Sequence, residues 1–278
     1  MDNGKQKLDP PVGRGVWWAL GTALVVTGTA WAGVLAVDVL DVGGVRERLF
    51  VAREADMPHL YIHLADNNRP LEWVQWILLI VGSVTSGLAS GRWLERGERD
   101  RAMRVGGLAI LLGLLAIKDA GSPRHVIRAY VLDWFGETAM YLAELTVFGV
   151  VAAVALVVFV RLLPLARLDR PTGRLLIIGY STYAVAALMS ATRTFWYQDT
   201  GLWIQRNVFR DRMLQAFYEE GQGYMFMDSI VEESVELLAI GLLVALSFRL
   251  LEVSRGHRLS LDSPATAGSP HSRPSRSP

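Results

Sequence analysis

Three glutamates stand at the beginning of the last apolar stretch of the sequence, in MDSIVEESVELLAIGLLVAL (residues 227–246). Glu232 and Glu236 are one helical turn apart and Glu233 lies beside them, so a helix would present all three along one stripe. Carboxylates inside a membrane span are costly and usually mark a binding or proton-relay site. Ser229, three residues before Glu232, also fits a capping box at a helix start. The stretch therefore predicts either a proton or cation site or a polar helix end.

A fourth glutamate and two cations are expected at the same depth of the membrane. Glu144 lies within another apolar stretch, and Lys118 and Arg193 end two more. Because four carboxylates meet two cations, ion pairing alone leaves an excess of acid, which protonation, loop arginines or a bound cation would neutralise. An internal ion-pair network and a misplaced span boundary are the alternatives. The candidates for the reacting groups are Glu236 and Glu144, and the polar cluster around them is Glu232, Glu233, Lys118 and Arg193.

The histidines suggest a second kind of chemistry. His59 and His63 are four residues apart in MPHLYIHLAD, and Asp66 follows three residues later. A helix after Pro58 would point all three in one direction, as a ligand set for zinc or a similar divalent metal, with His125 from another loop as a further ligand. Solvated histidines on a surface helix are the simpler alternative. A metal at these residues would activate water, and Glu236 would act as general base.

Several chemistries have no support in the sequence. Cysteine is absent, which excludes disulfides and thiolate ligands. There is no phosphate-binding glycine loop, no dinucleotide fingerprint, no nucleophile elbow and no zincin motif. No histidine lies within an expected span, so a haem site is not expected.

The elements that position these residues are predicted to be membrane-spanning helices. The chain of 278 residues is 51% hydrophobic with a mean hydropathy of +0.28. Its apolar residues come in blocks that are hydrophobic on all sides, and about 20 such residues are needed to cross a bilayer. The third and sixth blocks are short between charges. The six predicted spans are 16–39, 71–91, 105–120, 138–160, 173–193 and 229–250.

The charges between the spans predict the orientation. With the N-terminus in the cytoplasm, the inside segments hold 17 lysines and arginines against 8 acids, and the outside loops hold 11 against 13. This is the positive-inside pattern, and omitting the third span would break it. We therefore expect an all-α, polytopic protein of the cell membrane with both termini cytoplasmic. The predicted divisions are residues 1–15 as N-terminal segment, 16–250 as six-helix transmembrane bundle, and 251–278 as a disordered Ser/Pro-rich tail.

Two outer loops and some small residues complete the predicted bundle. Residues 122–137 and 201–223 are predicted to form short interfacial helices on the outer face, the second ending at Gly221 and Gly223. Small residues at helix-packing spacing predict close contacts between spans. These small residues are Gly28 and Ala32 in the first span and Ser83, Gly87 and Gly91 in the second.

NRPLEWVQWILLI, which opens the second span, and VEESVELLAIGLL in the last resemble segments of uncharacterised bacterial multipass membrane proteins. The resemblance implies a multipass membrane fold and no particular activity. Three functions remain open: a proton or cation site, a metal-dependent hydrolase or transferase acting on a lipid or envelope substrate, and a non-catalytic scaffold. The expected partners are the lipid bilayer and an envelope or membrane protein, and no nucleic acid.

Overall fold

The computed structural model describes residues 12–45, 70–120, 123–209 and 219–261, together with Arg48, Leu60 and Leu64. Every regular element within these residues is helical, which confirms the prediction of an all-α chain. The helices are α1 (Arg14–Val34), α3 (Pro70–Glu95), α4 (Arg99–Ala120), α5 (Pro123–Leu162), α6 (Arg170–Asn207), α7 (Glu219–Phe226) and α8 (Glu233–Leu261). Two π-helical segments, Leu35–Val39 and Met227–Glu232, extend α1 and join α7 to α8.

Five of these helical stretches are long and apolar enough to cross a membrane. They are Arg14–Val39, Pro70–Glu95, Leu145–Arg167, Arg170–Arg193 and Gly223–Arg255. All six predicted spans fall within helices, but the third, 105–120, lies in α4, which is not among the five. Its apolar run is confined between Arg104 and Lys118. The fold is thus compatible with a membrane protein.

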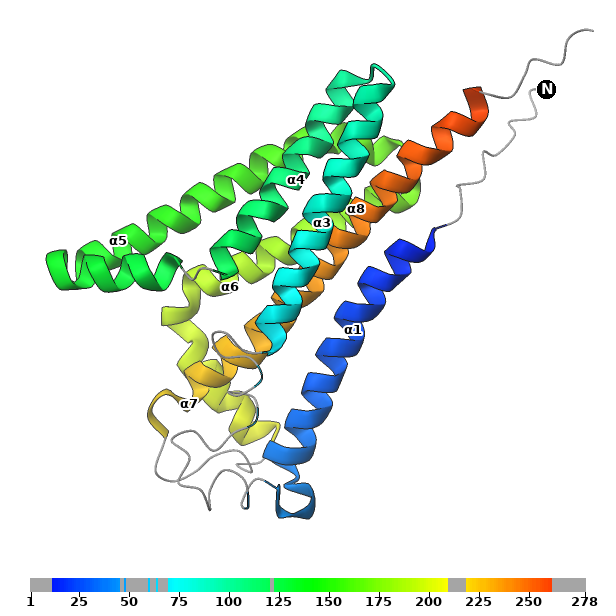
Figure 1. Ribbon diagram of the computed structural model, residues 1–278. Coiled ribbons are helices and arrows are strands. Elements are labelled where there is room, and N and C mark those ends of the chain that lie inside the picture. The colour runs from blue at the N-terminus through cyan, green and yellow to red at the C-terminus, as the bar shows by residue number, and fades with distance from the viewer. Residues whose placement is uncertain are drawn as a thin grey trace, which may run out of the picture.

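The central helix of the bundle is α8. It contacts α1, α3 and α6, while α4 lies against α3 and α5 (Figure 1). The most apolar window of α8 is 72% buried, against 17% to 39% in the other four candidate spans. Leu237, Ile240, Leu243 and Val244 form the middle of this buried helix. The core of the protein is therefore built around α8 and not around a shared central space.

The helices alternate in direction. The end where α8 begins, with Glu232, Glu233 and Glu236, is called here the acidic end, and the end that contains Arg249 the basic end. Trp31 of α1, Lys118 of α4 and Arg193 of α6 all contact the acidic end from the C-terminal parts of their helices. Hence α1, α4 and α6 run toward the acidic end, and α3 and α8 run away from it (Figure 1).

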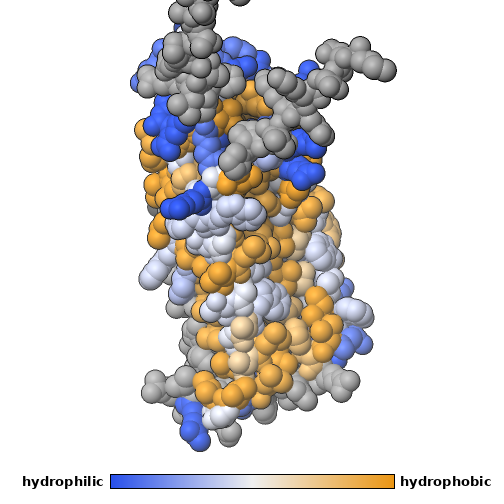
Figure 2. All heavy atoms as spheres, turned by 90° about the vertical axis from the view of Figure 1, so that its right-hand side faces the viewer, coloured by the Kyte–Doolittle hydropathy of each residue, from blue (hydrophilic) through white to orange (hydrophobic). Residues whose placement is uncertain are grey.

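The outward faces of the helices are strongly apolar. Large side chains such as Leu24, Ile110, Leu145 and Leu188 are each more than half exposed. Figure 2 shows hydrophobic side chains over the length of one face of the molecule, with hydrophilic residues gathered mainly toward one end. Soluble monomeric proteins rarely expose so much contiguous apolar surface. The exposed surface is of the kind that lipid covers.

Small residues bring α3 and α4 together as a close hairpin. The Ser83 hydroxyl donates to the Ala109 carbonyl oxygen at 2.8 Å, and the Ser90 hydroxyl donates to the Ala102 carbonyl oxygen at 2.7 Å. A Cβ on Gly106 would lie 3.2 Å from Ser90 Oγ. Among the small residues predicted for packing, Ser83 is at this interface.

The glycines predicted for packing are not at helix contacts. A Cβ added to Gly28, Gly87 or Gly91 would meet nothing within 4 Å in the described structure. In α3, the glycine that packs is Gly82, one residue before the predicted row of Ser83, Gly87 and Gly91. Leu112 of α4 and Val244 of α8 each lie 3.0 Å from its ideal Cβ. Spacing alone does not say which of two adjacent helical faces meets a neighbour.

The acidic end differs from the predicted loop structure. Residues 201–207 continue α6 instead of starting a separate helix, and Gly221 and Gly223 lie inside α7. Ser229 is not a helix cap, because the chain is already helical from Glu219 and passes through the π-helical segment without a break. At the opposite terminus of α8, the helix continues to Leu261, into the stretch predicted as tail.

The other predicted interfacial segment is helical but continuous with a span. Residues 123–135 form the first part of α5, which is interrupted at Gly136 (φ 80°, ψ 178°). Only glycine adopts this backbone conformation without strain, so Gly136 allows the chain to change direction there. Figure 1 shows the first part of α5 turned sharply away from the long second part.

The two glycines Gly201 and Gly223 hold α6 and α7 in backbone contact. A Cβ on Gly201 would overlap the Gly223 carbonyl oxygen, and a Cβ on Gly223 would overlap the Gln198 carbonyl oxygen. Tyr224 N–H donates to Gln198 Oε1 at 2.9 Å beside this contact. The glycines thus serve close approach, which is why they stand in helices where another residue would be a better helix former.

Gly201→Ala is expected to lower the stability of the detergent-solubilised protein by about 1–3 kcal/mol, because the new methyl group forces two backbones apart. Gly28→Ala is the matched control, since its Cβ meets open space, and it should leave stability unchanged or raise it by up to about 1 kcal/mol. Unfolding followed by tryptophan fluorescence measures both. Equal effects of the two substitutions would contradict the close contact of α6 and α7.

Candidate functional site

The beginning of α8 is surrounded by polar side chains from four other helices. Trp31 comes from α1, Gln75 from α3, Lys118 from α4, and Arg193 and Tyr197 from α6. The Trp31 indole N–H donates to Ser234 Oγ at 2.9 Å. The acidic end is therefore a polar layer within a bundle whose neighbouring layers are apolar.

Glu232 is buried and bonded to α6. The Tyr197 hydroxyl donates to Glu232 Oε2 at 2.6 Å, and Ser190 of the same helix lines the cavity that Glu232 also lines. Tyr197 is fully buried, and its burial together with the Glu232 carboxylate raises the pKa of the Tyr197 phenol above its ordinary value. The phenol therefore stays protonated and remains a hydrogen-bond donor to Glu232.

Glu233 faces α3 instead. Gln75 Nε2 donates to Glu233 Oε2 at 2.7 Å and to the Glu233 carbonyl oxygen at 3.2 Å. The negative charges of Glu236, Glu232 and Glu72 all act on the Glu233 carboxylate. Within the described structure, the Glu233 carboxylate thus accepts a hydrogen bond from a neutral amide while like charges surround it.

The two predicted cations lie at this end, on different acids. Lys118 Nζ is 3.8 Å from Glu236 Oε1, and Arg193 Nη1 is 3.3 Å from Asp228 Oδ1. Arg193 is buried, and Lys118 and Glu236 are about four-fifths buried, with side chains 24% and 16% exposed. Five carboxylates of the described residues thus gather here with two cations: Glu72, Asp228, Glu232, Glu233 and Glu236 with Lys118 and Arg193.

Glu232 and Glu236 open into one small cavity. It has a volume of about 40 Å³ and lies between α4, α5, α6 and α8. Lys118, Ser190 and Tyr183 contribute polar atoms to its wall, and Val151, Ala152, Ala186 and Ala187 make the rest. A space of this size holds water or an ion, since a water molecule needs roughly 10–15 Å³ on this scale, and it excludes a lipid chain.

The remaining predicted site residues fall where the structure describes no side chain. Glu144 lies on α5, two turns before Val151 and Ala152 of the cavity wall, with only its backbone described. His125 likewise lies on α5 with only its backbone described, and His59, His63 and Asp66 lie outside the described residues. Among the described residues there is no group of three His, Cys, Asp or Glu side chains that could hold a metal ion. The histidine metal site stays a sequence prediction.

Several contributors to the acidic end were not predicted, among them Glu72, Gln75 and Tyr197. Glu72 and Gln75 are polar residues in the first turns of an apolar helix, and their spacing of three places them on one face. That pattern could have indicated a polar contact of this face. Tyr197 had no such signal, because a tyrosine near the end of a span is typical of the membrane interface. Its role follows only from the packing of α6 against the start of α8.

The basic end has a buried ionic contact of its own. Arg249 of α8 is 1% exposed, and its Nη2 lies 3.4 Å from Asp169 Oδ2 and its Nη1 3.2 Å from Glu252 Oε2. Asp169 Oδ1 accepts from the Thr172 backbone N–H at 2.8 Å and thereby caps α6. Glu252 accepts from the Gly13 N–H at 3.1 Å, just before α1. Arg249, predicted only as one of the inside charges, therefore joins three helices.

Comparisons with known proteins leave the site to be judged from its own geometry. The chain matches no protein-family model, and searches of curated proteins and of solved structures give no significant match. The resemblance to bacterial multipass membrane proteins therefore stays an expectation from the sequence.

Tyr197→Phe is expected to destabilise the protein by about 1–3 kcal/mol, because a buried carboxylate loses a hydrogen bond. Tyr180→Phe is the matched control on the same helix, since the buried Tyr180 hydroxyl has no hydrogen-bond partner in the described structure and its loss should cost nothing. Unfolding in detergent compares the two. A Tyr197→Phe protein as stable as Tyr180→Phe would contradict a supporting role of the Tyr197–Glu232 bond.

Proposed function

We propose that the chain is an integral membrane protein whose acidic end holds a buried site for a small cation, either a proton or a metal cation. The observation that carries this proposal is the cavity shared by Glu232 and Glu236, in which Lys118 is the one cation among the described lining residues. Two carboxylates beside one ammonium leave a net negative charge in a small buried space. A proton or a bound cation would neutralise that charge.

The wider charge balance supports the same function. Around the start of α8, the described carboxylates Glu72, Asp228, Glu232, Glu233 and Glu236 outnumber the described cations Lys118 and Arg193. Low surrounding polarity increases the free-energy cost of an uncompensated charge. Gln75 and Tyr197, which donate to Glu233 and Glu232, are neutral.

The two other functions find less support at this end. A hydrolase or transferase that uses Glu236 on a lipid needs a site there that admits part of the lipid, and the cavity of about 40 Å³ that Glu236 lines does not. A scaffold that docks an envelope or membrane protein needs no cavity. In a scaffold, the charges of the acidic end would only hold the helices together, and the cavity would have no role.

We include α4 as a sixth membrane span in this proposal, with both termini cytoplasmic and the acidic end outside. At 22 residues, α4 is about 33 Å long, close to the roughly 30 Å of a bilayer core. It lies antiparallel against α3 and joins the basic end to the acidic end. Six crossings also keep the arginines after α5 on the same side as those before α4.

Single-cysteine labelling tests this topology directly, because the native chain has no cysteine. Cysteines replacing the exposed residues Arg99, the first residue of α4, and Trp134, in the first part of α5, should lie on opposite sides. A membrane-impermeant maleimide on intact cells should then label position 134 at once and position 99 only after permeabilisation. Labelling of both positions from the same side would show that α4 does not cross.

Glu232→Gln and Glu236→Gln test the cation site. Thermal unfolding of the wild type in detergent is measured across a series of pH values and of sodium, potassium, magnesium and calcium concentrations. A bound cation stabilises the native state, by about 2.7 kcal/mol at 100 times its dissociation constant, so the wild type should be stabilised by acid or by one of the salts. Either substitution should remove most of that response.

Asp199→Asn is the control, because Asp199 is an exposed acid of α6 at the same end and does not line the cavity. It should keep the wild-type response. Stabilisation by acid alone would identify the cation as a proton, and stabilisation by a salt at constant pH would identify a metal cation. An equal response in all four proteins would refute the site and favour the scaffold.

A further inference from the structure

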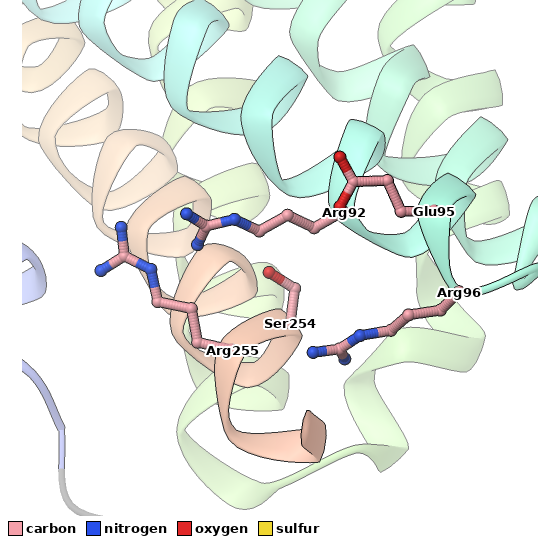
Figure 3. Close-up of a pocket in the computed structure, with 5 residues that line it drawn as sticks. All are labelled: Arg92, Glu95, Arg96, Ser254 and Arg255. Atoms are coloured by element: carbon pink, nitrogen blue, oxygen red, sulfur yellow. The ribbon is translucent and has the colours of Figure 1, made fainter. Parts of the chain in front are cut away.

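A second polar site lies at the basic end, between the C-terminal parts of α3 and α8. It is a pocket of about 350 Å³ lined by Arg92 and Glu95 of α3, by Arg96 in the turn after α3, and by Ser254 and Arg255 of α8. Figure 3 shows the side chains of Arg92, in α3, and Arg96, just after α3, extending toward α8, while the Glu95 side chain ends beside its own helix. Three guanidinium groups and one carboxylate give this pocket a positive charge.

Two of these arginines have buried nitrogens without a hydrogen-bond partner. In the described structure, Nη1 of Arg92 and Nη1 of Arg96 are both buried and bonded to nothing. Both residues are half-buried, and a buried donor nitrogen without a partner costs about 1–3 kcal/mol. Arginines that serve only the positive-inside pattern would extend into water, so that pattern does not account for these two.

Neighbouring arginines of the same end show the contrast. Arg101 pairs with Glu98, and Arg104 lies 2.9 Å from Asp100. Arg104 also donates to the Arg161 carbonyl oxygen at 2.7 Å. Within the described structure, Arg92 and Arg96 thus lack the acidic partners that these two neighbours have, although one nitrogen of each is buried.

The donors of the pocket fit an oxyanion. The Ser254 hydroxyl is already committed as a donor to the Leu251 carbonyl oxygen at 2.7 Å, so the guanidinium groups are the available donors. Guanidinium forks bind phosphate and carboxylate oxygens in pairs. An excess of two positive charges over the one carboxylate matches a dianionic phosphate better than a single carboxylate, and the volume lies within the range of small-ligand sites, about 300–1,000 Å³.

We propose that this pocket binds a phosphate group through Arg92, Arg96 and Arg255. The phosphate comes from the headgroup of an anionic phospholipid or from a soluble phosphate compound. The pocket lies at the ends of two candidate membrane spans, where basic pockets between helices bind lipid headgroups. This site is separate from the cation site of the acidic end and stands whether or not that site exists.

The test measures the unfolding temperature of the full chain in detergent in two arms. One arm adds inorganic phosphate, with chloride at equal ionic strength as the blank. The other adds phosphatidic acid to the micelles, with phosphatidylcholine as the blank. The wild type should be stabilised in at least one arm, and Arg92→Gln/Arg96→Gln should weaken the apparent affinity at least about tenfold. Stabilisation by phosphatidic acid alone identifies a lipid headgroup, and stabilisation by inorganic phosphate shows that the phosphate group suffices.

Arg99→Gln/Arg174→Gln is the matched control, since it removes the same charge from two exposed arginines of the basic end. It should respond as the wild type does. Without phosphate, Arg92→Gln/Arg96→Gln should be no less stable than the wild type, because the buried nitrogens have no hydrogen bonds to lose. If this double variant fails to fold, Arg92→Lys replaces it, keeping the charge but losing the fork, and should bind more weakly. No stabilisation in either arm, or an equal response of both double variants, overturns the proposal.

Discussion

Carboxylates in the most deeply buried helix need polar partners, and this need governs what the surrounding helices present at the acidic end. Within the apolar interior, the start of α8 receives Tyr197 and Ser190 from α6, Gln75 from α3 and Lys118 from α4. Each of these side chains interrupts an otherwise apolar helix at the depth of the glutamates. The polar layer thus specifies how far each helix is inserted relative to α8, which apolar packing alone does not do.

The other end of α8 is held in a comparable way but by a different balance of charge. Arg249 is surrounded by Asp169 and Glu252, so that a buried cation meets two acids there. Between the two ends, the contacts of α8 are almost entirely apolar, apart from the Ser86 hydroxyl, which donates to Ser247 Oγ at 2.8 Å. Such a helix resists sliding along its axis because a shift of one turn would bury charges without partners at both ends.

Hydropathy and charge predicted much of this arrangement. Apolar blocks identified the helical stretches, and the positive-inside pattern placed Lys118 and Arg193 at the same depth as the glutamates, where the structure also has them. The partners Gln75 and Tyr197 were missed, because which residue of a helix meets a given carboxylate depends on the rotation of that helix. The same uncertainty in rotation led to Gly87 and Gly91 being assigned to a contact that Gly82 and Ser83 make.

Helix ends were the least predictable feature. A serine followed by a glutamate three residues later predicted a cap at Ser229, yet α7 had already begun upstream and the π-helical segment carries the chain through. Likewise, Gly221 and Gly223 suggested a helix stop, whereas Gly223 is needed for contact with Gly201. Local patterns of this kind compete with tertiary contacts, and in this protein the contacts decide.

The π-helical segment Met227–Glu232 also determines how α7 is rotated about the helix axis relative to α8. A π turn accommodates one more residue than the α turn it replaces. Gly223 upstream meets α6 and Glu232 downstream also meets α6, so the extra residue determines that both faces point the same way. The number of residues between Gly223 and Glu232, rather than the identity of the intervening residues, thus determines that both face α6. In related chains, the length of this short interval would be preserved even where its side chains vary.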